Sequence, residues 1–333
     1  METVVKITCG PIHGCILSLA VMVLPCGALF GQDPQLTLER TLMTHTKNVH
    51  SAPISRDGHF LASASSDQTV KYWDIETGHE LKSFSGHTGD VNTVAISPDG
   101  RLLASGSDDK TVRVWDVNAG RELYNLAGHT GFVQGVAFSP DGKLLASASY
   151  DKTVILWNPH TGKEVRTLNG HTEPVFGVTF SPDGRWLASA SNDKTVRIWN
   201  VRTGKNVKTL TGHTDSAHGI AFGPDGKLLA GGSYDSTVTI WDVASEQVVR
   251  TLKGSGKIEG VCFSSDGHLV GAGNREGIVR FWETSTGQEV LAMTRPAIAF
   301  SVRFSPDDKR VVTTAGSAID IWAVSMKSNK AAK

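Results

Sequence analysis

The chain lacks an excess of either charge, and it lacks the short motifs of several enzyme classes. Lys and Arg together number 33, and Asp and Glu also number 33, so the formal net charge at pH 7 is zero. A nucleic-acid-binding protein needs a basic surface that releases counterions from phosphates. Neutrality therefore argues against a nucleic-acid partner. The sequence also contains no phosphate-binding loop and no CxxC pair.

Cysteine is scarce, and it is placed where it cannot cross-link the main part of the chain. Three of the four cysteines, Cys9, Cys15 and Cys26, lie in the first 26 residues. Cys262 lies in the apolar run 260–263, where a buried and inert thiol is expected. The region after residue 31 therefore has no internal disulfide and must be held together by packing.

Long hydrophobic runs are absent except for one near the start. Residues 14–24 (GCILSLAVMVL) form an apolar run that ends at Pro25, with Lys6 before it and small residues after it. This order is typical of a secretory signal, so we expect residues 1–31 to be a signal peptide and the protein to be periplasmic or extracellular. The alternative is an uncleaved segment that anchors the protein in a membrane, although the run is shorter than the roughly 20 residues that span a bilayer.

What the sequence does contain is one unit of about 42 residues that recurs seven times. A histidine recurs every 42 residues from residue 45 to residue 213. A period of this size indicates copies of one supersecondary unit that bury their hydrophobic faces on each other, and such chains usually serve as binding scaffolds. The clearest marks are seven tryptophans spaced by 42, 42, 42, 42, 41 and 40 residues, namely Trp73, Trp115, Trp157, Trp199, Trp241, Trp282 and Trp322.

Residues 86–126 represent the unit. Four short strands joined by tight turns form one antiparallel sheet. Because the strand-like runs are apolar on both faces, each sheet must be covered on both sides, and sheets stacked face to face around an axis satisfy this requirement. The sequence therefore predicts an all-β fold. The expected strands lie at residues 91–97, 102–107, 111–117 and 122–126.

Three motifs recur in register with the unit: Gly-His near its start, Ser-Pro-Asp-Gly after the first strand, and Trp-Asp at the end of the third strand. Through these motifs the chain resembles the WD-repeat β-propellers over residues 36–323. The resemblance implies a monomeric seven-bladed propeller of four-stranded antiparallel blades, followed by a Lys-rich C-terminal tail at residues 324–333. Full Trp-Asp matches are Trp73-Asp74, Trp115-Asp116 and Trp241-Asp242, whereas the other four tryptophans are followed by Asn158, Asn200, Glu283 and Ala323.

Closure of the ring is expected to use the start of the repeat region. Residues 36–42 precede the first unit and resemble the fourth-strand segment 164–168. They are expected to complete the blade whose other strands come from residues 298–323. In the family such a shared blade holds the ring shut, and a closed ring has few exposed sheet edges.

Four side-chain types recur at fixed offsets in units one to four. Ser, His and Asp together suggest hydrolase chemistry, but the resemblance implies that each set, here called a tetrad, is a structural chain of hydrogen bonds from Trp to Ser, Ser to His and His to Asp. The hydroxyl is then buried and engaged, so we expect no catalytic residue. The tetrads are His45, Ser63, Asp67 and Trp73; His87, Ser105, Asp109 and Trp115; His129, Ser147, Asp151 and Trp157; and His171, Ser189, Asp193 and Trp199.

The regular histidines are not expected to bind a metal. Their 42-residue spacing places them in different blades, far from the geometry of a zinc site, and no cofactor is expected either. The later units lose parts of the tetrad. Unit five has Gly231 in place of the Ser, unit six has Ala272 and Glu276, and unit seven has Gly316 where the Asp is expected.

Irregular positions are the candidates for function. In the family, three positions of each blade surround the mouth of the central channel on the narrower face. Exposed aromatic rings among polar groups mark interaction sites; the alternative is that these rings pack on their own loops. The positions that match in this chain give a partner-binding set that is rich in aromatic residues: Phe132, Gln134, Tyr150, Phe176, Asn192, His218, Tyr234 and Phe300.

The expected function is that of a non-catalytic interaction scaffold that binds a protein or peptide around the channel mouth. The alternative is a propeller enzyme or a cofactor-binding protein that acts at the same mouth. Its candidate groups, His50, Asp90, Glu259 and His218, come from separate blades and show no motif spacing. A third reading is a purely structural module of the cell surface.

Overall fold

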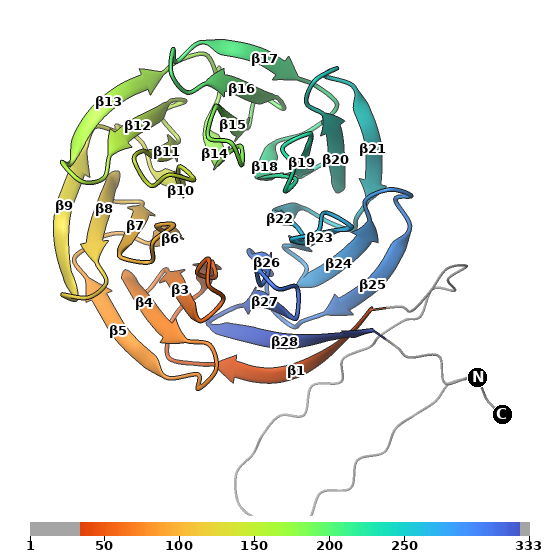
Figure 1. Ribbon diagram of the computed structural model, residues 1–333, viewed down its shortest axis with the longest axis horizontal. Helices are drawn as coiled ribbons and strands as arrows, with labels where there is room; N and C mark the ends of the chain where they lie inside the picture. Colours follow the sequence, from red (N-terminus) through yellow and green to blue (C-terminus); the bar gives the residue numbers. More distant parts are fainter. Residues whose placement is uncertain (1–33, 327–333) are drawn as a thin grey trace, which may run out of the picture.

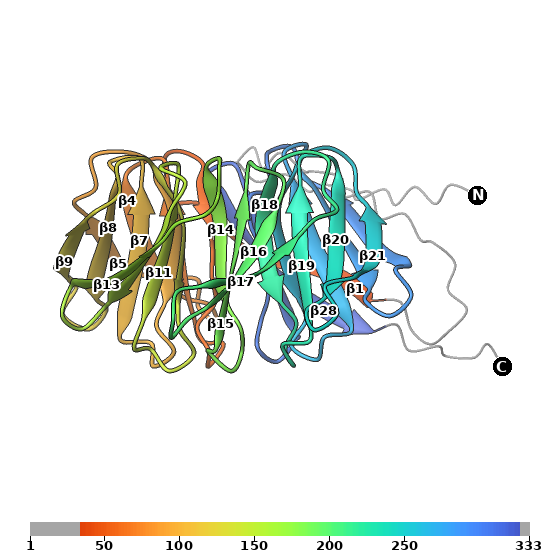
Figure 2. The ribbon, with the colours of Figure 1, turned by 90° about the horizontal axis from the view of Figure 1, so that it is seen from above.

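The structure is a computed structural model that describes residues 34–326. The signal peptide expected at residues 1–31 and the end of the Lys-rich tail lie outside the described residues. Seven four-stranded antiparallel sheets stand around a central channel, which confirms the predicted propeller (Figure 1). Seen from the side, the ring is a short cylinder whose strands run between its two faces (Figure 2). Among residues 34–326 no helix has the length and apolarity that crossing a membrane requires.

Each of the first six blades takes its innermost strand first in sequence and its outermost strand last. Blade one consists of β2 (Val49–Ser51), β3 (Phe60–Ser65), β4 (Thr69–Asp74) and β5 (Glu80–Ser85); blade two of β6 (Val91–Ile96), β7 (Leu102–Ser107), β8 (Thr111–Asp116) and β9 (Arg121–Ala127); blade three of β10 (Val133–Phe138), β11 (Leu145–Ser149), β12 (Val154–Asn158) and β13 (Lys163–Leu168); and blade four of β14 (Val175–Phe180), β15 (Trp186–Ser191), β16 (Val196–Asn200) and β17 (Asn206–Leu210).

The remaining blades follow the same order until the last. Blade five consists of β18 (Ala217–Phe222), β19 (Leu228–Ser233), β20 (Thr237–Asp242) and β21 (Val248–Lys253); blade six of β22 (Ile258–Phe263), β23 (Leu269–Asn274), β24 (Ile278–Glu283) and β25 (Glu289–Thr294); and blade seven of β26 (Val302–Phe304), β27 (Arg310–Ala315), β28 (Ala318–Met326) and β1 (Pro34–Leu42). Residues 324–326, assigned to the tail on sequence, belong to β28.

Packing between neighbouring blades supplies the core. One cluster joins Tyr72 and Phe84 of blade one to Val94 and Trp115 of blade two. Equivalent clusters lie along the rest of the ring, and the repeat tryptophans are among the largest buried side chains. Both faces of each sheet are thus covered, as the apolar character of the strands requires.

The Ser-Pro-Asp-Gly turn is stabilised by its own side chains. Ser97 donates a hydrogen bond to Asp99 at 2.6 Å, and its hydroxyl accepts the amide of Leu102 at 2.9 Å. Gly100 has a φ of 72°, a backbone conformation that glycine adopts at little cost. These contacts fix the hairpin between β6 and β7 and so the direction of the inner strand that borders the channel.

The ring closes through β1, as predicted. This strand pairs antiparallel with β28 along its whole length, with a bulge at Glu39 between Leu38 and Arg40. Leu42 is 5% exposed and joins an apolar cluster with Trp73 and Ile319. Without β1, the edge of β28 would be free to pair with other chains.

Polar contacts reinforce the closure on both sides of the seam. Thr41 donates a hydrogen bond to Asp320 of β28 at 2.6 Å. Arg310 of β27 contacts Glu39 of β1 and Glu76 of blade one, each at 2.8 Å. The arginine therefore links the closing strand to the next blade.

Deletion of residues 34–43 should cost much of the thermal stability. It removes the burial of Leu42 and the pairing of β28, which together contribute roughly 5 kcal/mol and correspond to a fall in melting temperature on the order of 10 °C for a ring of this size. Differential scanning calorimetry of the shortened chain, with a chain that starts at Pro34 as the reference, measures this difference. Equal melting temperatures would show that β1 does not hold the ring closed.

Candidate binding site at the channel mouth

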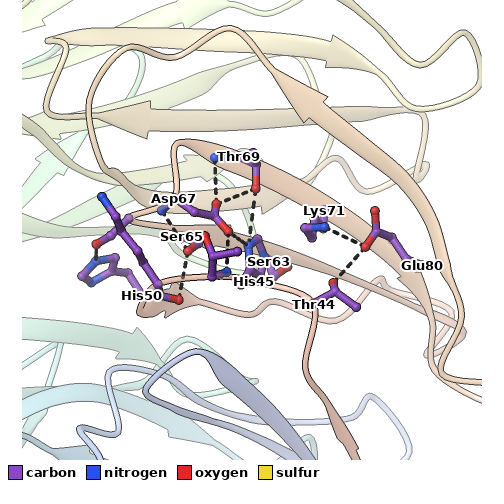
Figure 3. A network of polar contacts seen from close by, with 12 residues as sticks. Thr44, His45, His50, Ser63, Ser65, Asp67, Thr69, Lys71 and Glu80 are labelled. Carbon is purple, nitrogen blue, oxygen red and sulfur yellow. Dashed lines mark hydrogen bonds and ion pairs between the residues drawn. The ribbon is translucent and has the colours of Figure 1, made fainter.

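The tetrads are hydrogen-bonded chains inside the blades. In blade one, the Nε1–H of Trp73 donates to Ser63 at 2.9 Å, and Nε2 of His45 lies 2.7 Å from the same hydroxyl. Nδ1 of His45 lies 2.7 Å from Asp67, which also accepts a hydrogen bond from Thr69 (Figure 3). With Nδ1 protonated, Ser63 donates to His45 and accepts from Trp73. The same contacts, between 2.7 and 2.9 Å, occur in blades two, three and four.

This geometry explains why the tetrads are structural. Ser63 is fully buried, and both its donor and its acceptor capacity are used within the blade. A nucleophile needs a free hydroxyl beside an oxyanion site. The chain of bonds instead satisfies buried polar groups that would cost about 1–3 kcal/mol each if left without partners.

Blades five and six have lost this chain. Gly231 leaves no hydroxyl, so the indole of Trp241 donates to the carbonyl of Thr211 at 2.8 Å. His213 stays 3.3 Å from Asp235, while its Nε2 is buried without a partner. In blade six, Asn274 organises the turn instead, since its side-chain oxygen accepts the amide of Ile278 at 2.7 Å.

Blade seven replaces the tetrad with different residues, which the sequence analysis missed. Thr313 accepts the indole hydrogen bond of Trp322 at 2.9 Å and so takes the place of the serine. Arg295 lies over the Trp322 ring and contacts the buried carboxylate of Asp320 at 2.6 Å. Asp320 also accepts the hydrogen bond from Thr41 of β1. The polar network of this blade therefore includes the closing strand.

The replacement of His129 by Ala should destabilise the ring without affecting partner binding. It leaves the buried groups of Ser147 and Asp151 without their partner, which costs about 2–3 kcal/mol. Urea unfolding measures this loss. The exposed His79, replaced by Ala, is the control and should change stability by less than about 0.5 kcal/mol. A loss of binding in a folded His129→Ala variant would contradict a purely structural role.

Acid should weaken the tetrads. Burial alone would raise the pKa of the Asp109 carboxyl, but hydrogen bonds from Thr111 and His87 lower it from 3.8 to about 2. Burial lowers the pKa of His87 below 6.5, although Asp109 opposes this. When a pKa is lower in the folded state, the unfolded chain binds the proton first as the pH falls, so stability is lost below the unfolded pKa.

We therefore expect the free energy of unfolding to decline below about pH 6.5 and to fall more steeply between about pH 4 and pH 2. Urea titrations at a series of pH values measure this profile. An Asp109→Asn variant should be less stable at pH 7 and show a shallower decline in the acidic range. An unchanged slope in this variant would remove Asp109 from the explanation.

The channel opens on one face into a cavity of about 390 Å³ that is lined by inner strands and by the turns behind them. Seven of the eight residues expected at the mouth line this cavity, from Gln134 in blade three to Phe300 in blade seven. Phe132 does not line it, but its ring lies 5.5 Å from that of Tyr150. The structure thus brings the whole expected set to one opening.

Five of the rings form a continuous row, here called the aromatic arc: Phe132, Tyr150, Phe176, His218 and Tyr234. Tyr150 meets Phe176 edge to face at 5.4 Å. His218 is stacked between Phe176 and Tyr234, with centroid distances of 3.8 Å on both sides. Phe132 and Tyr150, at the open end, are each 40% exposed. The rings therefore support one another and still present an apolar surface to solvent.

Glu259 of blade six joins the closed end of the arc. Its carboxylate accepts the hydroxyl of Tyr234 at 2.7 Å, lies 3.4 Å from Nδ1 of His218, and pairs with Arg275. Burial alone would raise the pKa of Glu259, but these three donors lower it below its ordinary value. The guanidinium of Arg275 and the ammonium of Lys257 both lie over the Tyr234 ring. Burial, with the charge of Glu259, raises the pKa of Tyr234.

The opposite side of the mouth is built by blades seven and one. The rings of Phe300 and His50 lie 4.5 Å apart, and Nε2 of His50 is 2.7 Å from the hydroxyl of Ser66. Burial lowers the pKa of His50, although the charges of Asp90 and Glu259 oppose this shift. His50 and Glu259, which the enzyme alternative would use, are thus already engaged with neighbouring side chains.

One cavity residue was missed entirely. Arg303 of β26 lines the mouth cavity and also a second cavity, which is bordered by the C-terminal ends of the inner strands β14, β18 and β22. The sequence could have revealed it, because the other six blades have a small residue at the position of the unit that Arg303 occupies. These residues are Pro53, Ala95, Ala137, Thr179, Ala221 and Cys262. No group of three or more His, Cys, Asp or Glu within residues 34–326 is arranged to hold a metal ion.

Two family models match the chain. The model described as WD domain, G-beta repeat, matches residues 36–74, 78–116 and 120–158. The model described as IFT122 first beta-propeller matches residues 148–333, which is more than half of the 333 residues. The chain therefore belongs to the WD-repeat β-propeller family, whose members are generally protein-interaction scaffolds.

Proposed function

We propose that the protein is a non-catalytic scaffold that binds a protein or peptide at the channel mouth. The observation that carries this proposal is the aromatic arc, a row of five rings in mutual contact. Four of the rings line one side of a cavity large enough for one or two side chains, and Phe132 extends the row beyond it. Aromatic residues with polar neighbours dominate the affinity of protein interfaces. Rings that are already fixed by their neighbours also lose little conformational entropy on binding.

The enzyme alternative has one specific observation in its favour, the hydrogen bond between His50 and Ser66 at the mouth. A Ser–His pair can act as nucleophile and base when a third group orients the imidazole. Among residues 34–326, however, no side chain hydrogen-bonds to Nδ1 of His50, so no third group orients its imidazole. Glu259, the acid that lines the same cavity, is already engaged with Tyr234, His218 and Arg275. A structural role for the His50–Ser66 pair, in the lining of the mouth cavity, therefore fits these contacts better than a catalytic role does.

We also propose that the protein is exported and works in the periplasm or outside the cell. The support is the layout of residues 1–31, with a basic residue, an apolar run and small residues in that order. The first residue of the mature protein, read by mass spectrometry, distinguishes a cleaved signal from a retained membrane anchor.

A triple change of Tyr150, Phe176 and Tyr234 to Ala should abolish partner capture. Cross-linking in the native compartment with mass spectrometry identifies the partner, and calorimetric titration then compares the variants. Because anchor rings contribute roughly 2 kcal/mol each, we expect the affinity to fall by more than about 100-fold.

The matched control replaces Leu81, Val165 and Val207 by Ala. These side chains are as exposed as the open end of the arc, at 47%, 50% and 42%, but they lie on the outermost strands β5, β13 and β17. Circular dichroism establishes that both variants are folded. If the triple variant at the mouth captures the partner as the wild type does, the site lies on another surface.

A further inference from the structure

We propose that the inner end of the mouth cavity is a carboxylate-binding subsite, formed by Arg303 and Ser301, which receives an acidic side chain or a chain terminus of the bound peptide. This inference rests on the proposed function for the identity of the ligand as a peptide. The subsite itself follows from the positions and partners of the residues on the inner strands.

Arg303 is a cation without an acid. Its Nη1 donates hydrogen bonds to the carbonyls of Val261 at 3.2 Å and Val302 at 2.8 Å, and these are the hydrogen bonds of its side chain within residues 34–326. Other arginines near the inner strands or the seam are paired, as Arg275 is with Glu259 and Arg295 is with Asp320. A guanidinium with a free planar edge binds carboxylates through two parallel hydrogen bonds.

Partial burial makes this charge costly unless an anion compensates it. Burial lowers the pKa of the Arg303 guanidinium, and no carboxylate among the described residues lies within ion-pair distance of it. The charged side chains that line the cavity are Glu259, Arg275 and Arg303. Because Glu259 and Arg275 neutralise each other, the cavity keeps one positive charge at its inner end.

Ser301 supplies a second donor at the same place. It lies two residues before Arg303 in extended backbone, so both side chains project to the same side of the strand. Ser301 is 3% exposed, lines the cavity, and its hydroxyl has no hydrogen-bond partner. Leaving a buried hydroxyl unpaired costs about 1–3 kcal/mol, which a bound oxygen acceptor would recover.

The equivalent positions in the other blades show that this hydroxyl is exceptional. In blades three to six the position is a glycine. In blade two, Thr93 accepts the amide of Val136 at 3.3 Å, and in blade one Ser51 donates to the carbonyl of Val94 at 3.4 Å. Within the described residues, blade seven is thus the one blade with an unpaired hydroxyl at this position, that of Ser301. It is also the one blade with an arginine two residues later, Arg303.

A third buried group indicates that the ligand carries an amide. His218 lines the same cavity and is 7% exposed, and its buried Nε2 has no hydrogen-bond partner. Because Nδ1 faces the Glu259 carboxylate and is the donor, Nε2 is left as an acceptor. A peptide offers both groups, an N–H for His218 and a carboxylate for Arg303 and Ser301.

The test uses the purified full chain and three small probes that differ only in charge placement. N-acetylglutamine carries a terminal carboxylate, N-acetylisoglutamine carries a side-chain carboxylate, and N-acetylglutaminamide carries neither. We expect the two acids to bind with dissociation constants on the order of millimolar, as their size allows, and to shift the NMR resonance of the Arg303 Nε–H. The neutral probe should bind at least tenfold more weakly. The tighter of the two acids identifies the source of the carboxylate.

Variants separate the subsite from the rest of the mouth. Arg303→Gln should weaken the acids at least tenfold, Arg303→Lys should restore part of the affinity, and Ser301→Ala should weaken them by a smaller factor. Arg185→Gln, in which an exposed turn arginine is changed, is the control and should bind as the wild type does. Thermal melts show which variants are folded. If Arg303→Gln does not fold, Ser301→Ala, which is a smaller change, still tests the subsite.

Two outcomes would overturn the subsite: equal binding of the neutral and acidic probes, or wild-type binding of the acids by folded variants at both Arg303 and Ser301. The proposed function fails in a different way. If the acids bind through Arg303 while the triple variant of the arc still captures the partner, the carboxylate subsite stands and the aromatic interface does not.

Discussion

The pairing of β1 with β28 is the constraint on which the rest of the structure depends. In a ring each blade is stabilised only by its two neighbours. An open seam would therefore expose to solvent the apolar sheet faces that blades one and seven bury against each other. The seam is also where the repeat is least regular, because blade seven lacks the tetrad and its inner strand spans only Val302–Phe304. A polar network at the seam joins the two ends of the described chain within one blade. It consists of Thr41, Asp320, Arg295 and Trp322.

The regular and irregular positions of the unit have different physical roles. A tetrad satisfies its own buried groups inside one blade, so it can be repeated without regard to the neighbours. Its loss in blades five and six is accommodated locally, by the carbonyl of Thr211 in one case and by Asn274 in the other. The residues around the mouth instead contact partners across blades, as His218 does with Phe176 and Glu259. Such contacts cannot be repeated by copying one unit.

This difference explains how far the sequence could predict the molecule. Periodicity placed the strands of residues 86–126 to within a residue or two and indicated the closing strand, because both depend on local patterns within one unit. The family positions brought Tyr150, Tyr234 and their neighbours to the mouth. They could not reveal that Glu259 contacts Tyr234 and His218 of blade five, or that Arg303 has no acidic partner among the described residues. Contacts between blades leave no mark in the spacing of residues along the chain.

Glycines on the inner strands, just below the aromatic arc, allow neighbouring blades to approach closely at the channel. Gly177 follows Phe176 directly, and a Cβ at Gly177 would lie 2.3 Å from the carbonyl oxygen of His218. Gly219 likewise stands against the carbonyl of Glu259. Because these positions have no side chains, the inner strands of blades four, five and six approach closely. This approach allows His218 to stack on Phe176 and on Tyr234, each with a distance of 3.8 Å between ring centroids. Blades one, two and seven have Ser51, Thr93 and Ser301 at this level.

The channel is therefore asymmetric although the unit is repeated. On the side of blades three to six, glycines draw the strands together and the aromatic arc results. On the side of blade seven, the strand keeps the hydroxyl of Ser301 and the guanidinium of Arg303, for which residues 34–326 provide no hydrogen-bond partner and no acid, respectively. A ligand that enters such a mouth meets an apolar wall first and a positive charge at the inner end. This order favours a peptide that presents an apolar segment to the rim and a carboxylate to the channel, and it disfavours a uniformly basic or uniformly apolar partner.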